Sequence, residues 1–84
     1  MMIIVDSARK HGIGDADIVY VYETSDVAFV PQDQEGIIML LGFDTIGRGL
    51  EVAYLTTIED VDVVIHAMKI RPEYKKILDD YKGA

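Results

Sequence analysis

Residues 37–43, Ile37-Ile38-Met39-Leu40-Leu41-Gly42-Phe43, decide the fold of this chain. In an extended strand, successive side chains point to opposite faces of the sheet, and here both alternating sets are apolar. A strand with two apolar faces must be covered on both sides. The stretch therefore predicts a central strand, with helices on one face and a partner, such as a second copy of the chain in a homodimer, on the other.

Three more β-favouring segments surround this strand, at 27–30, 50–57 and 63–68. The intervals 31–36, 44–49 and 58–62 are short and carry turn residues, among them Gly47 and Gly49, so they leave no room for crossover helices. The pattern predicts a four-stranded antiparallel meander. Residues 2–5 add a candidate short N-terminal strand.

Helical patterns flank the four strands. Two short helices are predicted over 7–11 and 15–24, the second with Asp15 and Asp17 in its first turn, where the helix dipole favours acids. After Pro72, residues Tyr74, Ile77, Leu78 and Tyr81 recur at helical spacing on one face, and Gly83 is a stop signal. The chain is therefore predicted to be a single α+β domain over 1–84, with a helical layer against one sheet.

Composition narrows the functional classes. The chain has 84 residues, 50% of them hydrophobic and 27% charged, which is typical of a globular domain. It has no cysteine and a net charge of −7. The longest apolar run has five residues, against about 20 for a membrane-spanning helix. We expect a cytoplasmic protein without membrane contact, and the negative charge opposes nonspecific binding to nucleic acid.

Most familiar catalytic motifs are missing. There is no phosphate-binding loop or dinucleotide fingerprint, and Ser7 and Ser25 lie near predicted helix ends, where capping is the common role. Two histidines without a close acidic partner in sequence are too few for a recognisable metal site. We therefore expect neither a metal nor a cofactor.

The remaining candidates are residues that transfer protons or bind phosphate. On strand 63–68, Val63, Ile65 and Ala67 should face the helices, which places His66 on the opposite side. A tight turn around Glu59 and Asp60 would pair His66 with Ala53 and make Glu51 its diagonal neighbour. The candidates are His11, Arg48, His66, Lys69, Arg71 and Tyr74.

Several of these residues also have a purely structural interpretation. His66 could be a strand residue bonded to a backbone carbonyl, and His11 suits the C-terminal end of a helix. Arg48 could be a solvated turn residue. Arg71 could tie down the start of the last helix.

Three groups of residues, taken in order, resemble small bacterial proteins of the BrnT-like toxin family, and the similarity covers roughly residues 6–81. The first group is Asp6-Ser7-Ala8-Arg9-Lys10-His11-Gly12-Ile13 followed by Asp15-x-Asp17-Ile18, the second is Gly42 with Gly47-Arg48-x-Leu50-Glu51-Val52, and the third is Ile65-His66-Ala67-Met68-x-x-Arg71-Pro72-x-Tyr74. Gly49 departs from the family pattern, which usually has a larger apolar residue there.

The resemblance implies a RelE/ParE-like fold and the toxin role in a type II toxin–antitoxin pair. It further implies metal-independent ribonuclease activity on mRNA, which inhibits translation until a small DNA-binding antitoxin binds the toxin. By motif position the matching residues are His11, Arg48, His66 and Arg71, and we add Lys69 and Tyr74 as neighbours.

Such cleavage needs a base for the 2′-hydroxyl proton, a cation for the phosphate and an acid for the leaving oxygen. We assign His66, Arg71, Arg48 and Tyr74 to catalysis, and His11 and Lys69 to substrate binding. The alternative is a non-catalytic module with the same fold, whose apolar sheet binds an antitoxin-like protein and whose acidity opposes RNA contact.

Overall fold

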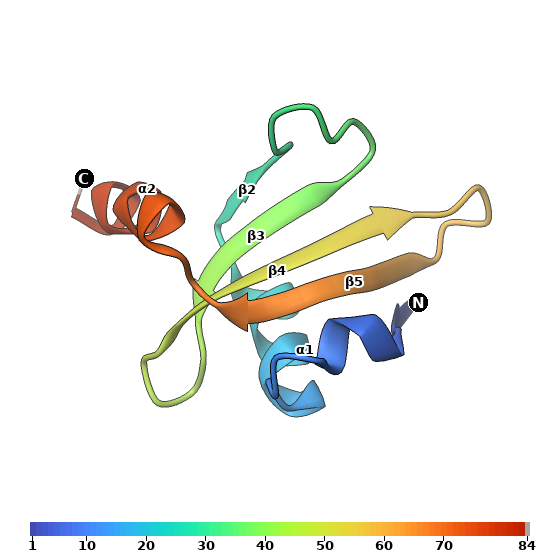
Figure 1. Cartoon of the computed structure of the whole chain (residues 1–84), viewed down its shortest axis with the longest axis horizontal. Helices are drawn as coiled ribbons and strands as arrows, with labels where there is room; N and C mark the ends of the chain where they lie inside the picture. The colour runs from blue at the N-terminus through green and yellow to red at the C-terminus, as the bar shows by residue number, and fades with distance from the viewer. Residues whose placement is uncertain (84) are drawn as a thin grey trace.

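Two α-helices and one five-stranded sheet make up the part of the chain that the structure describes, residues 1–83, with side chains described up to residue 81. The structure is a computed structural model (Figure 1). It confirms the predicted α+β class. In chain order the elements are β1 (Met2–Ile4), the 3₁₀ helix η1 (Asp6–Arg9), α1 (Asp15–Thr24), β2 (Val27–Phe29), β3 (Ile38–Phe43), β4 (Gly49–Thr56), β5 (Asp62–Lys69) and α2 (Pro72–Gly83).

The sheet has the strand order β1-β5-β4-β3-β2. Strands β2 to β5 form the predicted antiparallel meander, but β1 pairs with β5 in parallel, so the whole sheet is mixed rather than four-stranded and antiparallel. This parallel pairing is sterically simple because η1, α1 and three strands separate β1 from β5 in the chain. The first predicted helix is only a 3₁₀ turn of four residues, because the chain turns at Gly12 with a positive φ of 79°.

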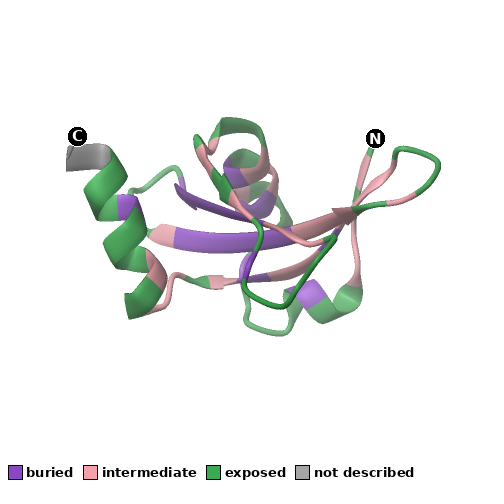
Figure 2. Ribbon diagram, turned by 90° about the horizontal axis from the view of Figure 1, so that it is seen from above, coloured by how far each residue is buried: buried purple, intermediate pink, exposed green. Residues whose placement is uncertain are grey.

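The helices lie on opposite faces of the sheet, which corrects the prediction of one helical layer. On β3, Leu40 packs with Ile18 and Val21 of α1, whereas Met39 and Leu41 pack with Leu78 of α2. Figure 2 shows the buried residues gathered along the middle strands, while α2 is exposed along most of its length. Because α2 covers part of the second apolar face of β3, a second copy is not needed to explain that face.

A β-bulge in β5 changes which side chains share a face. His66 pairs with Ala53 as predicted, but Tyr54 pairs with Val64, so Ile65 is an extra residue. Val64 therefore lies in the α1 core with Ala67, and Ile65 packs on the α2 side. In the predicted helix-facing set of Val63, Ile65 and Ala67, Ala67 does face the α1 core, whereas the prediction for Ile65 is wrong because of the bulge.

Neither helix in the described part of the chain is long and apolar enough to cross a membrane. The residues exposed on α2 include Ile77 and Tyr81, although both belong to its predicted apolar stripe. Only Leu78 of that stripe is buried, and Tyr74 is half-buried against Phe29. The helix therefore leaves part of its apolar face open.

Gly49 is the first residue of β4 rather than a turn residue, whereas Gly47 has the positive φ of a turn, 89°. A Cβ atom at Gly49 would lie 2.8 Å from Cγ2 of Ile70, which is too close for two carbon atoms. Ile70 cannot easily move away because β-branching restricts its χ1 rotation. The residue at 49 must therefore be small for the segment after β5 to pack beside β4.

We predict that Gly49→Ala lowers the free energy of unfolding by about 1–2 kcal/mol, since the added methyl group overpacks this contact. Urea titration followed by circular dichroism measures the loss. Ile70→Ala should cost less in the Gly49→Ala background than in the wild type, because it removes the clashing atom. Equal costs in the two backgrounds would contradict the proposed contact.

Candidate functional site

The candidate site is built around Glu51, a carboxylate that is 0% exposed in the middle of β4. A buried charge needs a charged or hydrogen-bonding partner. Arg71 supplies both: its Nε donates to Oε1 at 2.7 Å and its Nη2 to Oε2 at 3.1 Å. This bidentate pair raises the pKa of Arg71 further. It also fastens the segment between β5 and α2 to the centre of the sheet.

His66 lies on the same face of the sheet as Glu51, with its Nε2 3.9 Å from Oε1. That nitrogen is buried and has no hydrogen-bond partner among the described residues, although 26% of the side chain is exposed. Burial is the main cause that lowers the pKa of His66 below 6.5, and Arg71 adds to it, while Glu51 acts in the opposite direction. The imidazole is therefore neutral at pH 7.

His11 brings a second imidazole to the site. Its ring centroid lies 5.8 Å from that of His66, in an edge-to-face arrangement. His11 is exposed, in the loop between η1 and α1. The two histidines therefore meet although 54 residues separate them in the chain.

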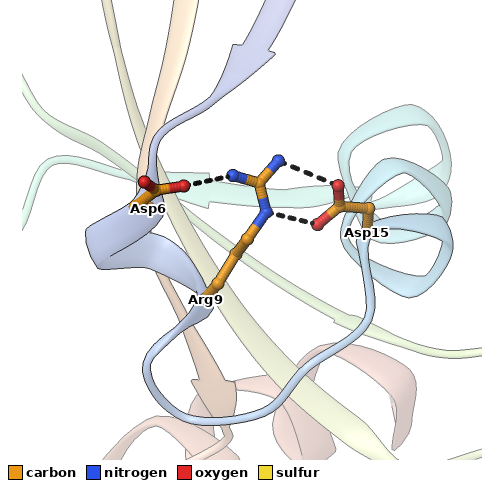
Figure 3. A network of polar contacts seen from close by, with 3 residues as sticks. All are labelled: Asp6, Arg9 and Asp15. Atoms are coloured by element: carbon orange, nitrogen blue, oxygen red, sulfur yellow. Dashed lines mark hydrogen bonds and ion pairs between the residues drawn. The ribbon is translucent and has the colours of Figure 1, made fainter.

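Arg9 closes the loop that carries His11 (Figure 3). Its Nε and Nη2 donate to the two carboxylate oxygens of Asp15, both at 2.9 Å, and its Nη1 donates to Asp6 at 2.8 Å. The guanidinium thus links η1 to the start of α1 and shortens the free length of the loop. Asp15 has a lowered pKa because it accepts the Arg9 bonds.

A pocket of about 200 Å³ lies on this face. Arg71, His66 and Gln34 are its polar lining residues. The Tyr74 ring lies under the Arg71 guanidinium at 5.0 Å from the centroid, a cation–π contact. The apolar lining residues are Ile37, Met39, Ala53 and Ile65. The site is therefore a small concave surface with convergent polar groups in an apolar setting.

The structure brings together four of the six predicted site residues, His11, His66, Arg71 and Tyr74, but not the other two. Arg48 bonds to the buried carboxylate of Asp44 at 2.5 Å and lies 3.6 Å from Asp17 of α1. Lys69 pairs with Leu50, whose side chain belongs to the α1 core. Arg48 and Lys69 are therefore directed to the α1 side of the sheet, away from the Glu51 pocket.

Two important residues were not among the predicted site residues. Glu51 was expected only as a neighbour of His66, yet a lone carboxylate inside the apolar segment 50–55 is itself a signal of a buried functional or structural charge. Arg9 gave no such signal, since its partner Asp15 looks like an ordinary acid in the first turn of a helix.

Comparison of the chain with protein-family models, with curated proteins and with solved structures gives no match.

The arrangement can perform acid–base chemistry. The neutral imidazole of His66 and the Arg71 cation line one pocket, and the exposed imidazole of His11 lies against that of His66. The cation is positioned by a buried carboxylate. Within residues 1–83, no group of three or more acidic or histidine side chains is arranged to hold a metal ion.

We predict that the two halves of the Glu51–Arg71 pair are unequal in stability. Arg71→Met leaves the fully buried Glu51 charge without its partner and should cost about 3–5 kcal/mol. Glu51→Gln should cost less, about 1–2 kcal/mol, because the Arg71 side chain is 42% exposed and can turn to water. Urea unfolding of both variants at pH 7 tests this order, and a larger loss for Glu51→Gln would contradict it.

We also predict that His66 titrates below 6.5 in the folded protein, since burial disfavours its cation. The unfolded chain then binds a proton more readily than the folded one. The stability contributed by neutral His66 is therefore complete above pH 6.5 and decreases as the pH falls towards the folded pKa. A histidine NMR titration gives the pKa directly. Unfolding curves of His66→Gln should lack this part of the pH dependence, and an unchanged dependence would assign it to another group.

Proposed function

We propose that the chain is a metal-independent ribonuclease of the BrnT-like, RelE/ParE-like toxin kind that cleaves mRNA. The observation that carries the proposal is that His66 lies beside the buried Glu51–Arg71 pair on one side and contacts His11, from a distant part of the chain, on the other. These are the acid–base and phosphate-binding types that cleavage through the RNA 2′-hydroxyl requires. A small DNA-binding antitoxin as partner and a cytoplasmic location belong to the same proposal.

His66 is proposed as the general base. A proton on its buried Nε2 faces the Glu51 carboxylate, which leaves the lone pair on Nδ1 to accept the 2′-hydroxyl proton. Glu51 is then a positioning residue, because it orients the ring without touching the substrate.

Arg71 is proposed to stabilise the negative charge that develops on the phosphate. Two of its five N–H donors bond to Glu51, and its exposed side can present others to a phosphate oxygen. Tyr74 supports the flat face of the guanidinium. His11 is exposed and adjacent, so it is the proposed acid for the leaving oxygen.

A second candidate is a non-catalytic module that binds an antitoxin-like protein. One observation favours it: both arginines expected to hold phosphate, Arg48 and Arg71, already bind carboxylates within the chain. The net charge of −7 also opposes the approach of RNA.

The experiment compares RNA cleavage by the purified wild-type chain, His66→Gln, Arg71→Lys and Lys76→Gln. Loss of a general base lowers such rates by about 10²–10⁴-fold, and we expect His66→Gln to fall in this range. Arg71→Lys retains the charge but loses the bidentate geometry, so we expect a smaller loss. Lys76→Gln removes an exposed cation from α2 and should leave the rate unchanged.

Growth and RNA integrity after induction in a bacterial host give the matching cellular result. Arrest with RNA loss for the wild type, and neither for the His66→Ala, Arg71→Ala double variant, is the expected outcome. Intact RNA and normal growth with the folded wild-type chain would reject the ribonuclease and favour the non-catalytic module.

A further inference from the structure

A second and larger hollow lies away from the Glu51 pocket, where α1 ends and α2 approaches β2 and β3. This cleft has a volume of about 340 Å³. Its apolar lining includes the buried side chains of Leu41 and Leu78. Neither α1 nor α2 fills it.

Two tyrosines stand at the cleft with much of their surface exposed. Tyr20 of α1 is 40% exposed and Tyr81 of α2 is 53% exposed. Tyr81 belongs to the apolar stripe of α2, whose other members contribute to the core or stay partly open. Tyrosines that combine a large apolar ring with a polar tip are frequent anchors of protein–protein interfaces.

Among the side chains that the structure describes, the charged residues lining this cleft are two acids, Asp26 and Asp44. There is no basic residue between Gly12 and Gly47, the segment that supplies most of the lining. Asp44 is neutralised by Arg48, whereas exposed Asp26 has no hydrogen bond or ion pair with any described residue.

We propose that this cleft binds a cationic amphipathic helix of a protein partner. Apolar side chains of the helix would enter between Tyr20 and Tyr81, and a Lys or Arg would reach Asp26 or a tyrosine ring. The charge of −7 on each chain disfavours a second copy as the occupant. This inference goes beyond the ribonuclease proposal and requires neither His66 nor Arg71.

The test uses two synthetic peptides of about 18 residues with the same helical leucine stripe, one with lysine and one with glutamate at the polar positions. Binding of each labelled peptide to the full chain is measured by fluorescence anisotropy. We expect the lysine peptide to bind and the glutamate peptide to bind at least about tenfold more weakly. Amide chemical-shift changes on adding the lysine peptide should map to the cleft.

Matched variants separate this cleft from a general effect of the acidic chain. Asp26→Lys should weaken binding about fivefold, whereas Glu59→Lys makes the same charge change in the exposed β4–β5 turn and should leave it within about twofold. Tyr81→Ala should weaken binding about tenfold. Ile58→Ala, at a residue 97% exposed in the same turn, is its control.

Equal weakening by Asp26→Lys and Glu59→Lys would overturn the proposal, since the peptide would then respond only to net charge. Amide chemical-shift changes that map outside the cleft would also overturn the proposal. So would a dimer in sedimentation experiments that is disrupted by Tyr81→Ala, because a second copy would then occupy this surface. RNA cleavage by Asp26→Lys should equal that of the wild type, so failure of the ribonuclease proposal and failure of this one give different results.

Discussion

The buried charge of Glu51 is the constraint on which the candidate site depends. A carboxylate without exposure in a central strand is stable only when a cation reaches it, and Arg71 does so from the short segment that follows β5. The pair therefore fixes where the chain leaves the sheet and where α2 begins. The two charges of the pair also act on His66 of the neighbouring strand, where Glu51 raises and Arg71 lowers its pKa. Stability and the candidate chemistry are linked through this one carboxylate.

The β-bulge at Ile65 decides which face carries His66. Near the β4–β5 turn, Thr56 pairs with Asp62, and continuing that register would place His66 opposite Val52, inside the α1 core. The extra residue shifts the remaining pairs by one, so that His66 lies opposite Ala53 and beside Glu51. A local irregularity in one strand thus places the imidazole on the face where the pocket is open.

Much of the fold could be predicted from periodicity, but which helix covers which face of the sheet could not. Alternation in 37–43 indicates two apolar faces without saying that α1 covers one and α2 the other, because both helices have apolar residues to bury. The pairing of His66 with Ala53 was predicted from a regular hairpin. In the structure, the strands leave the turn one residue out of that predicted register, and the bulge at Ile65 brings the pairs beyond it back into the predicted register. Arg48 could not be assigned to a face because turns have no periodicity, and its buried partner Asp44 resembles an ordinary turn residue.

The distribution of charge matters more for RNA contact than the total of −7. All eight Lys and Arg residues lie outside 13–46, and the basic side chains of the candidate site, His11, His66 and Arg71, also lie outside that range. Lys10 is close enough to His66 to help lower its pKa. Asp26, which has no ion pair with any residue that the structure describes, instead lies at the cleft between α1 and α2. Salt screens the interaction between exposed charges over about 8–10 Å. The electrostatic field of the acidic cleft is therefore felt mainly by molecules that come close to the cleft itself. The acidic chain therefore places a guanidinium paired with a buried carboxylate at one pocket, and Asp26 at the other cleft.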